Sequence, residues 1–149
     1  MKLKNNNIKK INLFLVYACF IFSPLIISKE IFISSSPSAE EEIQEAMILM
    51  EEGDTLVIKQ GYYSFEDSLS LDVDGVTITG EGMDQTILDF KNQKTGAQGI
   101  LVTSDSVTLK DFAILDAKGD ALKVIGSKSI NMINLRTEWT GGPKSTNGA

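Results

Sequence analysis

The chain has 149 residues, no histidine and a formal net charge of −6. Four of its fourteen basic residues lie within the first ten positions, so residues 29–149 carry ten basic against twenty acidic residues, a formal charge of −10. An acidic surface of this size repels nucleic acid and anionic membranes, which excludes a nucleic-acid partner. The lack of histidine removes the commonest general base and transition-metal ligand.

Residues 1–28 resemble a secretory signal peptide. A cluster of lysines is followed by the almost wholly apolar run Ile11–Ser28, which is the pattern that export machinery recognises. We therefore expect cleavage near Ser28 and a periplasmic or extracellular protein. The alternative is an uncleaved membrane anchor, because the run is nearly long enough to span a bilayer, although Ser23 and Pro24 weaken it in that role.

Cys19 is the only cysteine in the chain. The segment Val16–Cys19 resembles the lipobox of bacterial lipoproteins, in which the cysteine is acylated, but the bulky Tyr17 departs from that pattern. Contact with a membrane is thus expected only through the signal or a lipid anchor. The segment after residue 28 has no cysteine, so we predict neither a disulfide nor a cysteine-based metal site there.

Residues 38–50 have the pattern of an amphipathic helix. Ser38 stands at the N-cap position, and Glu41 occupies the place of the partner residue in a capping box. Four apolar residues fall on one face of this helix at helical spacing, namely Ile43, Ala46, Met47 and Met50. Because strand stacks must protect their first open edge, we expect the helix to cover that edge, just before a first strand that contains Leu56 and Ile58.

An internal repeat decides the fold. Pairs of short strands with alternating apolar residues recur at 69–78, 100–109 and 122–132, first 31 and then 22 or 23 residues apart. Such strands cannot bury their apolar faces alone, but they can when stacked. The stack would align four inward columns: Leu69/Ile100/Leu122, Leu71/Val102/Val124, Val76/Val107/Ile130 and Ile78/Leu109/Met132. Outward, Asp105 would lie over Lys128 and Asp111 over Asn134.

A third strand follows in each repeat, and here the sequence echoes itself. Residues 87–91 (Ile-Leu-Asp-Phe-Lys) are matched by residues 114–118 (Ile-Leu-Asp-Ala-Lys). The first repeat has nine extra residues, which we assign to two loops, about four to Gly80–Thr86 and about five to Asn92–Gly99, because loops absorb insertions cheaply. The sequence therefore predicts an all-β fold over residues 29–149, a right-handed parallel β-helix of about three coils with an N-terminal capping helix.

Several stretches resemble a known group of proteins. Residues 53–62 resemble the N-terminal cap and first strand of pectin-lyase-like β-helix proteins. Residues 88–102 and 118–149 resemble bacterial exported proteins called parallel β-helix repeat-containing proteins, and the Glu-Trp-Thr-Gly-Gly-Pro run at 138–143 is the most specific part. The resemblance implies further coils, so that this chain would be an N-terminal fragment. It also implies lyase, hydrolase or epimerase activity on polysaccharides.

Candidate site residues gather where the third coil departs from the apolar pattern. Asp116 and Trp139 are 23 residues apart, so they should be neighbours in the stack. An aromatic ring with carboxylates and cations suits a sugar site, and the carboxylates could also bind Ca²⁺. The candidate catalytic residues are Asp116, Asp120 and Glu138, and the candidate substrate-binding residues are Trp139, Arg136 and Lys118. The alternative is that aspartates in turns only accept backbone N–H groups.

These features predict an exported protein that binds or modifies a polysaccharide. The charge of −10 disfavours polyanionic glycans unless calcium bridges the two, so a neutral glycan fits better. Two alternatives remain open, a non-catalytic surface module that binds a glycan or a protein, and an accessory factor for an exported metalloprotein.

Overall fold

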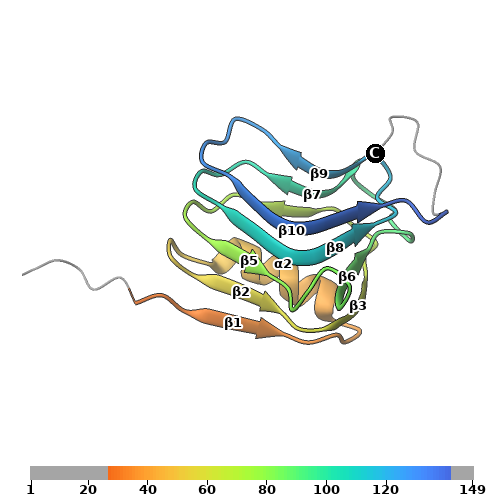
Figure 1. Cartoon of the computed structure of the whole chain (residues 1–149), viewed down its shortest axis with the longest axis horizontal. Helices are drawn as coiled ribbons and strands as arrows, with labels where there is room; N and C mark the ends of the chain where they lie inside the picture. Colours follow the sequence, from red (N-terminus) through yellow and green to blue (C-terminus); the bar gives the residue numbers. More distant parts are fainter. Residues whose placement is uncertain (1–26, 142–149) are drawn as a thin grey trace, which may run out of the picture.

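The computed structural model of the chain describes residues 27–141, which form ten strands and one helix (Figure 1). The signal-like segment with Cys19, and the Gly142–Ala149 end of the resemblance, lie outside these residues. The elements are β1 (Glu30–Ile33), α2 (Ala39–Leu49), β2 (Thr55–Ile58), β3 (Gly61–Ser64), β4 (Leu69–Leu71), β5 (Thr77–Thr79), β6 (Thr86–Asp89), β7 (Gln98–Val102), β8 (Thr108–Leu115), β9 (Asp120–Val124) and β10 (Asn131–Glu138).

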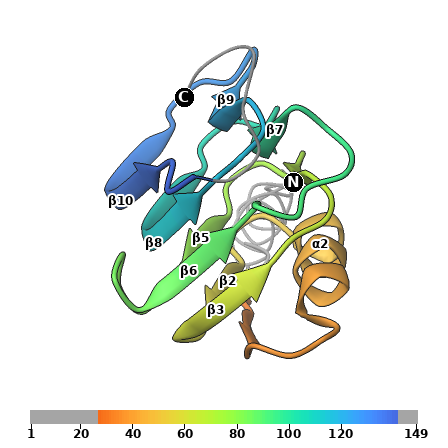
Figure 2. The ribbon, with the colours of Figure 1, turned by 90° about the vertical axis from the view of Figure 1, so that its right-hand side faces the viewer.

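All paired strands are parallel and form two sheets. The larger has the order β1-β2-β5-β8-β6-β3, with β10 also beside β8, and the smaller has the order β4-β7-β9. The larger sheet is curled into a half-barrel around the apolar side chains (Figure 2). The prediction of an all-β, parallel-strand fold with one helix is confirmed.

Three of the four predicted columns appear in the strand register, those through Leu69, Leu71 and Ile78. Leu69 pairs with Ile100, which pairs with Leu122, and the next column aligns in the same way. Ile78, Leu109 and Met132 also lie in register across β5, β8 and β10. Burial decreases toward the last strands: Leu122 is half-buried, and Met132 is 52% exposed. Side chains about 22 to 31 positions apart are therefore neighbours in space.

One strand bends where two were expected. The first half of β8 pairs with β5 and its second half with β6. The bend occurs at Asp111, whose φ of 61° lies in the left-handed region, and Asn134 bends β10 with a φ of 49°. Asn134 Nδ2 donates a hydrogen bond of 2.9 Å to Asp111 Oδ1, as the expected stacking of these residues requires. Asn and Asp tolerate this conformation better than most residues.

The outward pair of Asp105 and Lys128 is also stacked, but through a different contact from the one expected. The backbone N–H of Lys128 donates to Asp105 Oδ1 over 2.7 Å, so the backbone amide contacts this carboxylate. The contact therefore fastens one turn to the next by a backbone hydrogen bond.

The literal sequence echo is out of register by one residue. Leu88 pairs with Ile114, so Asp89 lies beside Leu115 and not beside Asp116. The register places five extra residues in Gly80–Thr86 and four in Asn92–Gly99, the reverse of the expected division. Burial explains the difference, because Leu88 and Ile114 both point into the core and are fully buried.

The helix confirms the predicted face but not the predicted cap. The four apolar residues expected on its inner face are buried, whereas Ile48 and Leu49 are exposed. Ser38 makes no side-chain hydrogen bond to the helix backbone, and its hydroxyl donates instead to Glu42 Oε1 over 2.5 Å. A capping box with Glu41 is therefore absent, because the hydroxyl is engaged one residue further along.

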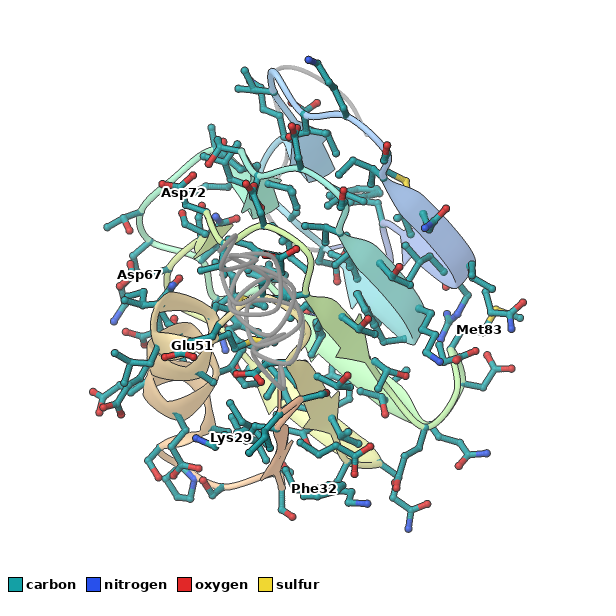
Figure 3. The ribbon with its side chains drawn as sticks, turned by 90° about the vertical axis from the view of Figure 1, so that its left-hand side faces the viewer. Lys29, Phe32, Glu51, Asp67, Asp72 and Met83 are labelled. Carbon is teal, nitrogen blue, oxygen red and sulfur yellow. The ribbon has the colours of Figure 1, made fainter. Side chains whose placement is uncertain are left out.

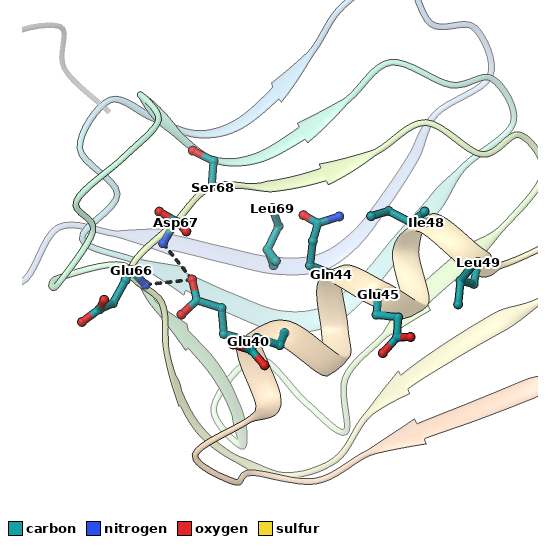
Figure 4. A pocket seen from close by; sticks show the side chains of 10 residues that line it. Glu40, Gln44, Glu45, Ile48, Leu49, Glu66, Asp67, Ser68 and Leu69 are labelled. Atoms are coloured by element: carbon teal, nitrogen blue, oxygen red, sulfur yellow. Dashed lines mark hydrogen bonds between the residues drawn. The ribbon is translucent and has the colours of Figure 1, made fainter.

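A side-chain amide completes the edge of β4. Gln44 of α2 donates to the carbonyl of Ser70 (3.0 Å) and accepts from its N–H (2.8 Å). Glu40 accepts from the N–H groups of Glu66 and Asp67, as Figure 4 shows. The helix therefore satisfies backbone groups that would otherwise be open, as the sequence predicted. The edge of β2 is covered differently, by the unpredicted strand β1.

The described residues also bear on membrane insertion. Within residues 27–141, the structure contains no helix with the length and apolar character needed to cross a bilayer.

Candidate functional site

The candidate site lies where four parallel strands, β3, β6, β8 and β10, end side by side. Glu138 pairs with Leu115 in the register of β10 and β8, and the N–H of Asp116 donates to the carbonyl of Glu138 over 2.9 Å. Asp116 and Trp139 are therefore neighbours, as their spacing predicted. The strand register, and not local sequence, brings them together.

Asp116 holds the chain beyond β10. It is 2% exposed and has a φ of 53°. Its Oδ1 accepts from the backbone N–H of Thr140 over 2.5 Å and its Oδ2 from the Thr140 hydroxyl over 2.6 Å. A buried carboxylate is stable when such donors replace water. This agrees with the structural alternative for Asp116.

Trp139 is fixed on both sides of its backbone. Glu138 before it and Thr140 after it both bond to Asp116. Its side chain is nevertheless 54% exposed. The ring therefore offers an apolar surface to solvent from a backbone that is already held in place.

Arg136 fastens a distant loop as well as contacting Glu138. Its Nη1 bonds to the Glu138 carboxylate, and its Nη2 donates to the carbonyl of Met83 over 3.2 Å. Its Nε lies 3.5 Å from Asp84 Oδ1. Met83 and Asp84 belong to the Gly80–Thr86 loop, which Met83 marks in Figure 3. Arg136 therefore orients Glu138 and pins this loop against β10.

Lys118 and Asp120 make their contacts away from Glu138 and Trp139. The Lys118 ammonium donates to the carbonyl of Lys94 over 3.1 Å, and the backbone N–H of Lys118 donates to Gln93 Oε1 over 3.0 Å. Asp120 pairs with Lys123 at 3.7 Å. Lys118 therefore contacts the loop between β6 and β7, and Asp120 lies at the start of β9. Neither contact involves Glu138 or Trp139.

Tyr62, which is not among the candidate site residues from the sequence, makes a further contact between the neighbouring strands β3 and β6. The Tyr62 hydroxyl donates to Asp89 Oδ2. This bond, followed by burial of the hydroxyl and the charges of Asp89 and Asp116, raises the pKa of Tyr62 to about 12. The other oxygen of Asp89 accepts from the N–H of Lys91 over 2.9 Å. The sequence is consistent with a hydrogen-bonded hydroxyl on Tyr62 but does not identify Asp89 as the partner, because the contact depends on the register of β3 and β6.

The strand ends therefore carry two exposed rings, Tyr62 on β3 and Trp139 after β10, with β6 and β8 between them, and the ion pair of Arg136 with Glu138. Tyr62 is 57% and Trp139 54% exposed. Asp89 and Asp116 are buried and accept hydrogen bonds from Tyr62 and Thr140. Such a surface can stack on an apolar ring face and hydrogen-bond to hydroxyl groups. Among the described residues, no group of three or more acidic, cysteine or histidine side chains is arranged to hold a metal ion.

A separate shallow groove runs between α2 and residues 66–69 (Figure 4). It is acidic, through Glu40, Glu45 and Asp67, and it ends at the exposed Ile48 and Leu49. None of the candidate residues from the sequence lines this groove.

Comparison with known proteins adds no relative. No protein-family model matches the chain, and no significant match was found among curated proteins or solved structures.

Proposed function

We propose that this chain is a glycan-binding module that recognises an uncharged sugar through Trp139. The observation that carries the proposal is the half-exposed indole whose backbone is anchored on both sides by Asp116. An indole face packs well on the C–H face of a pyranose ring. Glu138 and Arg136 beside it can hydrogen-bond to the sugar hydroxyls, and the formal charge of −10 on residues 29–149 favours a neutral ligand.

The hydrogen bonds favour binding over catalysis. A general acid or base must be able to reach a proton of the substrate. Both oxygens of Asp116 are engaged by Thr140, and both oxygens of Asp89 by Tyr62 and Lys91. The proposal therefore gives Asp116 a positioning role and leaves Glu138 to contact the sugar. It prefers a non-catalytic module to a lyase, hydrolase or epimerase.

The proposal includes the finer fold and an exported location. The parallel columns and the bends at Asp111 and Asn134 support a right-handed parallel β-helix of the pectin-lyase-like kind. The basic and apolar segment at residues 1–28 supports secretion by cleavage near Ser28, or lipidation at Cys19.

Isothermal titration calorimetry with neutral oligosaccharides, for example hexamers of β-linked glucose and xylose, tests the function. We expect binding that Trp139→Ala weakens at least tenfold and Trp139→Phe weakens less, because phenylalanine keeps an aromatic face. Ile48→Ala is the matched control, since Ile48 is exposed on α2. If no neutral glycan binds, or if Trp139→Ala binds as well as the original chain, the proposal is wrong.

A further inference from the structure

A second surface of this protein has its own regular pattern. It is the outer side of β1, β2 and β5 and of the first halves of β8 and β10, which lie side by side in Figure 1. The strand register aligns its residues in two columns. They are Glu30/Thr55/Thr77/Thr108/Asn131 and Phe32/Val57/Thr79/Lys110/Ile133. We call these ten residues the threonine face.

The residues of the threonine face point away from the core. Along β2, β5 and β8 they alternate with the fully buried Leu56, Ile78 and Leu109. The threonines themselves are half-exposed, and Phe32 at one end is 55% exposed (Figure 3). Successive side chains of a strand point to opposite faces of a sheet, so the buried column fixes the outward one.

This face is almost uncharged in a strongly acidic protein. Only Glu30 and Lys110 among its ten residues are charged, whereas residues 29–149 carry twenty acidic side chains. Threonine offers both a hydroxyl, which can donate and accept, and a methyl group. The face therefore provides repeated hydroxyl and methyl groups without the negative charge found elsewhere on the molecule.

The hydroxyl groups retain capacity for a ligand. Thr108 Oγ1 accepts only a long bond of 3.4 Å from Asn131, so its proton and second lone pair are available. Thr79 donates to the carbonyl of Gly80 over 3.0 Å and can still accept. The column Thr55/Thr77/Thr108 repeats at the spacing of neighbouring strands, about 4.8 Å.

We propose that the threonine face binds an extended, uncharged, β-linked polysaccharide that lies along the stack of strands. The strand spacing is close to the advance of one pyranose unit in such a chain. Each strand can thus present a threonine to a successive sugar. The absence of all but one carboxylate from the face matches a neutral polymer. This surface is separate from Trp139, so the proposal does not rest on the proposed function.

The test is adsorption of the full chain to insoluble neutral polysaccharides, with microcrystalline cellulose and chitin as the probes, and to polygalacturonate as the charged comparison. We expect retention on at least one neutral polymer, unchanged by added salt. The combined substitution Thr55→Val, Thr77→Val and Thr108→Val should weaken adsorption at least tenfold. Valine keeps the shape and strand propensity of threonine, and thermal unfolding checks that the variant is folded.

Two further variants make the result specific. Thr103→Val removes an exposed hydroxyl in a turn outside the face and should leave adsorption unchanged. Thr77→Arg places a long charged side chain at the centre of the face and should abolish it. Trp139→Ala should retain it. Three results would each overturn this inference: no retention on either neutral polymer, full retention by the triple valine variant, or loss of adsorption in Trp139→Ala alone. Of these, only the last would leave the Trp139 site supported.

Discussion

The carboxylate of Asp116 binds Thr140 twice, once at the backbone N–H and once at the hydroxyl, and so connects the end of β8 to the second residue after β10. Because Trp139 lies between Glu138 and Thr140, this connection also holds the backbone that carries the exposed indole. The pairing is between residues 24 positions apart, and it joins a buried carboxylate directly after β8 to the segment that carries the exposed Trp139.

Asp116→Ala should release this connection. We expect a loss of about 1–3 kcal/mol in the free energy of unfolding, because two donors on Thr140 lose a charged acceptor. Fluorescence anisotropy of Trp139, the only tryptophan, should fall. Urea unfolding and anisotropy measure the two effects. Asp120→Ala is the control, since the exposed pair with Lys123 contributes little. Unchanged anisotropy in Asp116→Ala would contradict the role of Asp116.

The Tyr62 hydroxyl should ionise well above pH 10. Its pKa is raised to about 12, first by the hydrogen bond to Asp89. Because the folded pKa exceeds the unfolded one, the stabilisation is complete below about pH 10 and is lost as the pH rises toward 12. Asp89→Asn should lower the pKa of Tyr62, measured by ultraviolet absorbance of tyrosinate with Tyr62→Phe to identify the transition. A transition that stays where it was in Asp89→Asn would disprove the coupling.

Asp54 should make the fold sensitive to acid. The N–H groups of Glu51 (3.0 Å) and Lys29 (2.8 Å) donate to its carboxylate and lower its pKa. Its stabilisation is therefore present above the unfolded value of about 3.9 and is lost as the pH falls through the lower folded pKa. Asp54→Asn should be less stable than the original chain at neutral pH, and the difference should shrink in acid. Urea unfolding at both pH values measures this, and an equal difference at both would refute it.

Gln44→Ala should expose the edge of β4. Both backbone groups of Ser70 lose their partner, and we expect a cost of about 1 kcal/mol because water can replace part of the amide. Hydrogen exchange should accelerate at the Ser70 amide. Glu45→Ala, one residue along the helix and exposed, serves as the control. Protection of Ser70 that survives Gln44→Ala would show that the amide does not act as an edge cover.

Substitution at the bend of β8 should depend on backbone conformation. Asp111→Gly should cost little, whereas Asp111→Val should cost about 2 kcal/mol or more, because a β-branched residue is strained at a φ of 61°. Thermal unfolding of the two variants gives the comparison. Lys110→Val, beside it in the regular part of β8, is the control. Equal stability of the two Asp111 variants would argue against strain at this position.

The sequence predicted the parts of the fold that follow from repeated apolar positions. It did not predict the register of β6 with β8, which the sequence echo had set one residue off. The columns through Leu69 and Ile78 follow from apolar alternation alone. The expected match of Asp89 with Asp116 came from identical residue types in the two segments. The inward direction of Leu88 instead fixes a register that differs by one residue. Strand β1 was missed because its short apolar run directly follows the signal-like segment.

The candidate site was only partly predictable for the same reason. The proximity of Asp116 and Trp139 follows from the repeat length, and so it was foreseen. The contacts of Arg136 with Met83 and of Tyr62 with Asp89 span 53 and 27 positions and depend on how a loop and a ring fold back. No repeat or motif encodes such contacts, which require side-chain positions.

The unequal loops have a consequence for how this architecture can vary. All nine additional residues of the first repeat fall in Gly80–Thr86 and Asn92–Gly99, yet the columns on either side of them remain aligned. Length and composition of these loops can thus diverge while the interior is conserved. A change in one of these loops can therefore alter the surface that a ligand meets, while the stacked strands keep their register.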